Sequence, residues 1–119
     1  MATLKTTLTL SSNDAMSDVL SVTVTDRLTT TNPTEFSRKS IATGSAQALI
    51  ASNSAFSYVY IKVISGANDT DFLQVKLGGD ALLKVRVGEF AFFPLYSGIA
   101  IDAESYGGAC VVEYGYWSI

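Results

Sequence analysis

The sequence predicts a single all-β domain, an antiparallel β-sandwich or small barrel of about eight short strands. Three observations lead to this prediction. Apolar and polar residues alternate along most of the chain, turn residues separate the alternating stretches at short intervals, and no long stretch has a helical period. At 119 residues the chain is near the commonest size for one domain and too short for two full cores.

The first two predicted strands alternate strictly. In residues 3–10, Leu4, Leu8 and Leu10 fall on one face and mostly threonines on the other, and residues 20–28 repeat this pattern. Eleven of the twelve threonines lie at or before position 43, whereas nearly all aromatic residues lie later. We therefore expect residues 40–119 to form the compact core. Residues 1–30 form either edge strands of the same sandwich or an arm that pairs with a neighbouring subunit.

Residues 29–40 show no sustained alternation. Pro33 cannot donate a hydrogen bond to a sheet, so a loop or a short edge segment is expected there. A weak strand follows at residues 46–51. Only residues 13–20 could hold a short helical turn, and the serines around them argue against more.

The second half contains the stronger strands. Residues 56–64 are apolar or aromatic on both faces, which is typical of a central strand covered on both sides. Residues 72–77 and 83–87 alternate on either side of a Gly-Gly-Asp turn and predict the clearest hairpin. Further strands are expected at residues 90–95, 99–103 and 109–117.

Aromatic side chains on these strands need cover on two opposed faces. If the strands are regular, one face fills the core and the other requires a second layer or a partner, because monomers rarely expose contiguous apolar patches. For the aromatic C-terminal end, a core position, a protein interface and a sugar-stacking platform remain open. The candidate interface residues are Tyr58, Tyr60, Phe90, Phe92, Tyr116 and Trp117, with Leu4, Leu8 and Leu10 of the N-terminal arm.

The residue types argue against catalysis. The chain has no histidine, which removes the usual general base and the commonest transition-metal ligand, and it has no phosphate-binding glycine loop. The carboxylate pairs Asp69 with Asp71 and Asp102 with Glu104 lie next to turn residues, where acidic groups are expected for local hydrogen bonding. A turn is also favoured over a calcium site at residues 68–71. We expect no catalytic residue, no cofactor and no metal.

Charge and composition limit the partners. The net charge is −3 and the basic residues are spread out, so nucleic acid is not expected. No apolar run is long enough to span a bilayer, and the N-terminus does not resemble a signal peptide. The lone Cys110 lies in an apolar run and is expected to be a small buried hydrophobe.

Three segments of the second half resemble a known group of proteins. Residues 58–62 (YVYIK), 88–95 (GEFAFFPL) and 112–117 (VEYGYW) resemble strand and turn segments of small structural proteins of tailed bacteriophages, of the capsid-decoration (cement) or accessory tail type. The likeness covers residues 55–119. It implies a β-sandwich of jelly-roll kind that is made in the host cytoplasm and acts on the virion. It also implies a symmetric homo-oligomer, with a trimer favoured, that contacts another virion protein such as the major capsid protein.

The first expectation is therefore a non-enzymatic virion protein that decorates the capsid. A glycan- or receptor-binding module of a tail fibre or tip is the alternative. It would show an exposed aromatic residue beside paired polar side chains. A small carboxylate-based glycosidase comes third, and would need two carboxylates lining one cleft.

Overall fold

The structure is a computed structural model that describes residues 2–15, 17–30, 35–51, 56–96 and 99–118. Its described residues form ten β-strands and no helix, so the all-β prediction is confirmed. No helix able to cross a membrane is found in this part of the chain. The chain divides into two compact units, residues 1–32 and 33–118, and each is described by itself.

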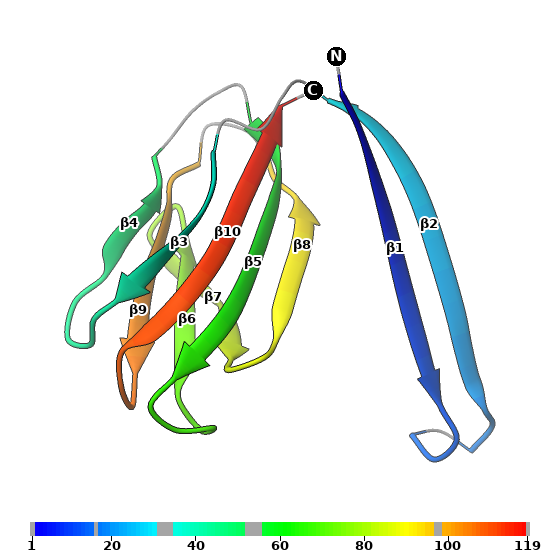
Figure 1. Ribbon diagram of the computed structural model, residues 1–119, viewed down its shortest axis with the longest axis horizontal. Helices are drawn as coiled ribbons and strands as arrows, with labels where there is room; N and C mark the ends of the chain where they lie inside the picture. The colour runs from blue at the N-terminus through cyan, green and yellow to red at the C-terminus, as the bar shows by residue number, and fades with distance from the viewer. Residues whose placement is uncertain (1, 16, 31–34, 52–55, 97–98, 119) are drawn as a thin grey trace. The chain divides into compact units, whose positions relative to one another are not determined.

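Figure 1 shows the order of the strands, and no helix lies between them in the described parts of the chain. They are β1 (Ala2–Ser12), β2 (Leu20–Thr30), β3 (Glu35–Ile41), β4 (Gln47–Ile50), β5 (Phe56–Gly66), β6 (Phe72–Leu77), β7 (Asp80–Arg86), β8 (Phe90–Pro94), β9 (Ile101–Tyr106) and β10 (Cys110–Ser118).

The first unit is a single long hairpin. Strands β1 and β2 pair antiparallel over eleven residues each, in one uninterrupted register that places Leu8 opposite Val24 and Thr7 opposite Thr25. They form a two-stranded sheet of their own, and neither strand belongs to the other two sheets of the described chain. The hairpin therefore has one layer and no second sheet within its own unit.

The second unit is a sandwich of two four-stranded sheets, which Figure 1 shows as two layers. One sheet has the order β3-β10-β5-β8 and the other the order β4-β9-β6-β7, and every pairing within them is antiparallel. Strand β5 lies between β10 and β8, in the interior of its sheet. Both sheets contribute inward side chains to one core.

The core consists of residues at alternate positions on the facing strands. Val59, Ile61 and Val63 of β5 are fully buried, and so are Leu73 and Val75 of β6. The other buried members are Ile41, Leu49, Ile50, Val85, Ile101, Ala103, Cys110, Val112 and Tyr114. Since side chains alternate between the two faces of a strand, the residues between these core positions form the outer faces of the sandwich.

The strand bounds agree with the sequence predictions most closely in the second half, where β6 covers the predicted residues 72–77. Gly78 and Gly79 adopt positive φ angles of 64° and 93° in the β6–β7 turn, as a tight hairpin turn requires. The expected loop at residues 29–40 is wrong in part, because β2 continues to Thr30 and residues 35–41 form β3. Strand β3 is an edge strand, which agrees with the other interpretation of that segment. No helical turn is seen among the described residues of 13–20.

Candidate functional site

Five aromatic side chains gather on the outer face of the β3-β10-β5-β8 sheet, and we name them the aromatic face: Phe36, Tyr58, Tyr60, Phe92 and Trp117. Phe36 stacks on Tyr60 with ring centroids 5.9 Å apart, and Tyr58 stacks on Phe92 at 6.0 Å. Trp117 joins the two pairs, because its ring lies 6.3 Å from the ring of Phe36 and 6.3 Å from that of Phe92. Four of the five are candidate residues from the sequence, and the fold brings them together.

The sheet register explains how rings from distant strands meet. Gly115 of β10 pairs with Phe36 of β3 on one side and with Tyr60 of β5 on the other. Because Gly115 has no side chain, the rings of Phe36 and Tyr60 can approach each other across the middle strand. Tyr60 in turn pairs with Phe92 of β8, so this row crosses all four strands.

A charged row lies next to the aromatic row on the same strands. Two residues along, Arg38, Glu113 and Lys62 occupy the neighbouring positions of β3, β10 and β5. The Nε of Arg38 donates a hydrogen bond to Oε2 of Glu113 at 3.1 Å, and the hydroxyl of Tyr60 donates one to Oε1 at 3.2 Å. Each carboxylate oxygen of Glu113 is thus held by a different neighbour.

The environment of Tyr60 disfavours its ionised form. Burial is the largest cause that raises the pKa of this phenol above its ordinary value of 10.0, followed by the hydrogen bond to Glu113 and the negative charge of that residue. The positive charge of Arg38 acts in the opposite direction. At neutral pH the hydroxyl of Tyr60 is therefore a donor that orients Glu113.

The two remaining aromatic candidates lie elsewhere. Phe90 of β8 pairs with Lys62 and is 63% exposed, beside the aromatic face but without a ring contact that joins it. Tyr116 of β10 packs against the hydrophobic core and is half-buried. The structure thus places Tyr116 with the core and not on the outer aromatic face.

The hairpin carries the other candidates. Leu4, Leu8 and Leu10 of β1 share one face with apolar residues of β2, since Leu4 pairs with Leu28, Leu8 with Val24 and Leu10 with Val22. We name these six side chains the hairpin apolar face. Leu8, Leu10 and Val24 are 45%, 47% and 54% exposed, whereas Leu4 is half-buried. The opposite face is mostly threonine.

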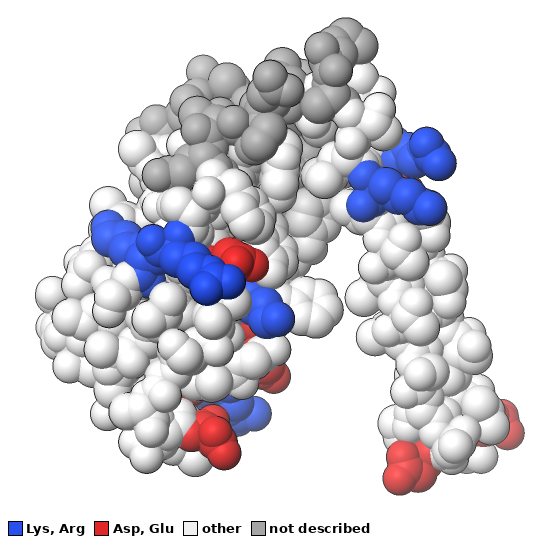
Figure 2. Space-filling view, in the orientation of Figure 1, with Lys and Arg blue, Asp and Glu red and all other residues white. Residues whose placement is uncertain are grey.

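Charges on the hairpin lie in the half next to its open end and in the segment that connects the strands. Lys5 and Arg27 pair with each other near the open end, and Asp14 and Asp18 lie in the segment that connects the strands. Figure 2 shows the surface between these ends as uncharged in this view. Asp26 pairs with Thr6 between the Leu4–Leu28 and Leu8–Val24 pairs, on the same side of the sheet as the hairpin apolar face. Beyond it, residues 7–10 and 22–25 carry no charge and present leucine, valine and threonine, a composition suited to contact with protein.

Sequence reasoning missed Phe36, Arg38 and Glu113. Phe36 and Arg38 fell in the segment expected to be a loop or a short edge segment, and residues 35–41 show no alternation of apolar and polar types that could have pointed to them. Glu113 looked like an ordinary polar residue of a strand. Its partners come from β3 and β5, so only the sheet order could have identified it.

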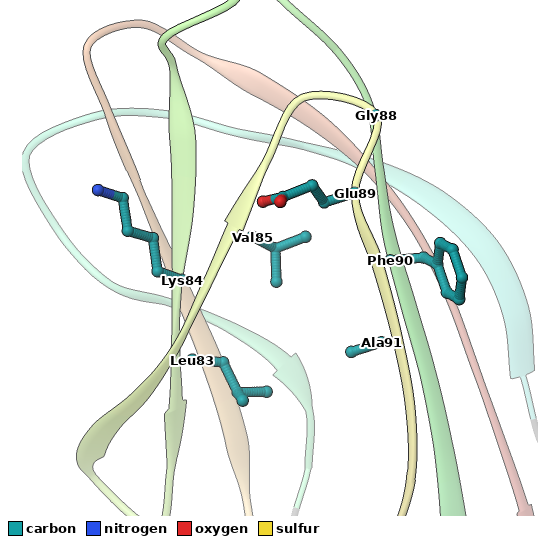
Figure 3. A pocket seen from close by; sticks show the side chains of 7 residues that line it. All are labelled: Leu83, Lys84, Val85, Gly88, Glu89, Phe90 and Ala91. Atoms are coloured by element: carbon teal, nitrogen blue, oxygen red, sulfur yellow. The ribbon is translucent and has the colours of Figure 1, made fainter. Parts of the chain in front are cut away.

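A pocket opens between the edge strands β7 and β8 (Figure 3). The side chains of Leu83, Val85 and Ala91 lie between the two strands, and Glu89 is its one acidic lining residue. Glu89 accepts a hydrogen bond from the backbone N–H of Arg86 at 2.8 Å, which ties it to its own turn. This lining lacks the two facing carboxylates that glycoside hydrolysis requires.

Two of the four acidic residues considered for catalysis, Asp71 and Glu104, have structural partners. Asp71 is 1% exposed, and its carboxylate accepts a hydrogen bond from the N–H of Asn68, which closes the turn that holds Asp69. Glu104 pairs with Lys76 at 3.6 Å. Within the described residues, no three His, Cys, Asp or Glu side chains gather where they could hold a metal ion.

Comparisons of the chain with protein-family models, with curated proteins and with solved structures find no significant match.

Proposed function

We propose that this chain is a non-enzymatic structural protein of a virion, in which it decorates the capsid and stabilises it through contacts with its own copies and with another capsid protein. The observation that carries the proposal is the exposed apolar face of the hairpin. Contiguous exposed apolar patches are uncommon on monomers and mark sites of contact with other molecules, as assembly requires.

The hairpin apolar face requires a partner on physical grounds. An isolated two-stranded hairpin is at best marginally stable in water, and stability needs further strands or packing against another layer. Full burial of one leucine or valine is worth roughly 1.5–3 kcal/mol. Covering Leu8, Leu10 and Val24, which are about half exposed, would therefore contribute several kcal/mol per copy.

The partner that fits best is protein. In the described sheets, β1 and β2 each pair on one side only, so each has an outer edge that can receive a strand. Adding a strand at such an edge supplies main-chain hydrogen bonds in register, and the alternating side chains then pack on one face. Repeated over many copies, modest contacts of this kind stabilise a particle strongly.

The virion setting rests on the resemblance of residues 55–119 to structural proteins of tailed bacteriophages. The strand order β3-β10-β5-β8 opposite β4-β9-β6-β7 supports the jelly-roll assignment, because consecutive strands alternate between the two sheets except where β6 and β7 form a hairpin. The trimeric state that the resemblance implies stays a prediction.

The test compares two faces of the same hairpin. Leu8→Glu places a charge on the apolar face, and Thr7→Glu places the same charge one residue away on the threonine face. We expect the wild type and Thr7→Glu to form the same oligomer by light scattering and to bind particles that lack the protein. We expect Leu8→Glu to lose both properties while its sandwich stays folded by circular dichroism. A wild-type monomer that does not bind particles at high concentration contradicts the proposal, and so do equal effects of the two variants.

A further inference from the structure

We propose that the aromatic face and the adjoining Arg38–Glu113 pair form a carbohydrate-binding site for a pyranose unit of a glycan. This site lies on the sandwich and uses none of the hairpin residues on which the proposed function rests. It therefore adds a second binding activity to the chain.

The apolar side of a sugar ring can stack on the aromatic face. The C–H bonds on one face of a pyranose carry a slight positive charge, and the face of an aromatic ring carries a negative one. Phe36 stacks on Tyr60 and remains 53% exposed, so it offers ring surface to a ligand. Contacts with Tyr60 and Trp117 fix its position before a ligand arrives, which lowers the entropy lost on binding.

The charged pair can hold the hydroxyl groups. Arg38 and Glu113 lie two residues along their strands from Phe36 and Gly115, a step of about 7 Å. One sugar unit can reach from the rings to this pair. A carboxylate has about four acceptor positions, and the hydrogen bonds from Arg38 and Tyr60 use two of those on Glu113.

Arg38 supplies the complementary donors. Its side chain is 62% exposed and donates to Glu113 through Nε. A guanidinium has five N–H donors, so Arg38 has further donors beyond this one. A sugar hydroxyl both donates and accepts, and a fixed carboxylate beside a guanidinium satisfies both roles. The site thus combines an apolar platform with a few oriented polar groups, which is the general form of a small-ligand site.

Two other classes of partner fit the same face less well. The core of a protein interface is depleted in charged residues, whereas Arg38, Glu113 and Lys62 lie directly beside the rings. Single-stranded nucleic acid also stacks on aromatic sheets, but its phosphates need a basic groove. Here a carboxylate occupies the centre of the charged row, and the chain has a net charge of −3.

The chain provides its own reporter, because Trp117 is its only tryptophan and belongs to the aromatic face. The intact protein is first screened on a glycan microarray. Trp117 fluorescence is then titrated with the soluble oligosaccharides cellotetraose, maltotetraose and chitotetraose, and with the best array ligand. We expect a saturable change in fluorescence with at least one of them. We expect Phe36→Ala and Arg38→Ala each to weaken binding by about tenfold or more.

Two controls separate this proposal from the others. Tyr96→Ala removes an aromatic residue that is 86% exposed and outside the aromatic face, and it should bind like the wild type. Leu8→Glu, the hairpin variant, should lose assembly but keep glycan binding. The proposal of a carbohydrate site is overturned if none of the glycans gives a saturable fluorescence change. It is equally overturned if Phe36→Ala binds glycan with the affinity of the wild type. It is also overturned if only a single-stranded oligonucleotide changes the fluorescence, or if Phe36→Ala dissociates the oligomer without affecting a glycan.

Discussion

Asp71 and Gly107 come from different loops, and the carboxylate of Asp71 occupies the space that a Cβ atom on Gly107 would need. Asp71 lies in the β5–β6 loop, where its carboxylate accepts a hydrogen bond from the N–H of Asn68 at 2.9 Å. Gly107 lies in the β9–β10 loop at φ +90°, a backbone conformation that L-residues with side chains rarely adopt. The two loops are thus packed together through a buried carboxylate.

We predict that Gly107→Ala lowers the free energy of unfolding by about 2–4 kcal/mol, since backbone strain adds to the collision with Asp71. Gly79→Ala is the matched control, because Gly79 has φ +93° and nothing lies within 4 Å of the point where an alanine Cβ would stand. This control should show the strain alone, about 1–2 kcal/mol. Chemical denaturation of both variants measures the difference. Equal losses in the free energy of unfolding would show that Asp71 moves aside for the alanine Cβ without destabilising the fold.

The half-buried phenol of Tyr60 predicts a dependence of the free energy of unfolding on alkaline pH. Because its pKa is raised in the folded state by burial and by Glu113, folding favours the protonated form. This contribution is fully present below the unfolded pKa of 10.0 and is lost as pH rises through the higher folded value. Spectrophotometric titration should show one phenol that ionises late and is missing in Tyr60→Phe.

A second variant identifies the cause of that shift. Glu113→Gln removes the negative charge beside Tyr60 and should lower the pKa of the phenol toward its ordinary value, while burial continues to raise it. At neutral pH, Tyr60→Phe should cost about 0.5–1.5 kcal/mol, the net worth of one hydrogen bond. A late-ionising phenol that persists in Tyr60→Phe would assign the shift to another tyrosine.

The sequence predicted the strands well because alternation is a local signal. The strand at residues 72–77 agrees in both bounds, since clear turn residues flank a strict pattern. The segment containing β3 was assigned in part to a loop because Pro33 precedes a short run with charged residues on both faces. Local pattern was too weak there, and pairing with β10 decides the structure.

The candidate site was predictable only in its aromatic residues. Tyr58, Tyr60 and Phe92 alternate with core residues, so their outward direction follows from the sequence. Their contacts with Phe36 and Trp117 depend on the order of four strands that are far apart in the chain. A single sequence carries no direct signal of that order, and the Arg38–Glu113 pair is inaccessible to local reasoning for the same reason.

The hairpin contains an unfavourable pair of two positive charges, and reversing one charge by substitution should relieve the repulsion. Lys5 and Arg27 lie directly opposite each other on β1 and β2, and like charges at such positions destabilise a sheet. Lys5→Glu replaces this repulsion by an attraction, and we expect it to stabilise the hairpin by about 0.2–1 kcal/mol at low salt. Hydrogen exchange of the hairpin amides measures the gain, and added salt should reduce it. Lys5→Gln should give an intermediate value, and equal protection in all three proteins would contradict the expectation.

The burial of Cys110 predicts that its thiol reacts much more slowly in the folded chain than in the unfolded chain. Its side chain is fully buried in the core, with Sγ 3.7 Å from the carbonyl oxygen of Gly108, and it is the only cysteine of the chain. We expect Ellman's reagent to react with the thiol only after a denaturant unfolds the sandwich, because a buried sulfur is inaccessible to the reagent. Cys110→Ser should lower the free energy of unfolding by about 1–3 kcal/mol, since it places a hydroxyl among apolar side chains. Cys110→Ala keeps the site apolar and serves as the control, with a smaller loss. Rapid modification of the native protein, or a serine variant as stable as the alanine variant, would show that the core around Cys110 admits water.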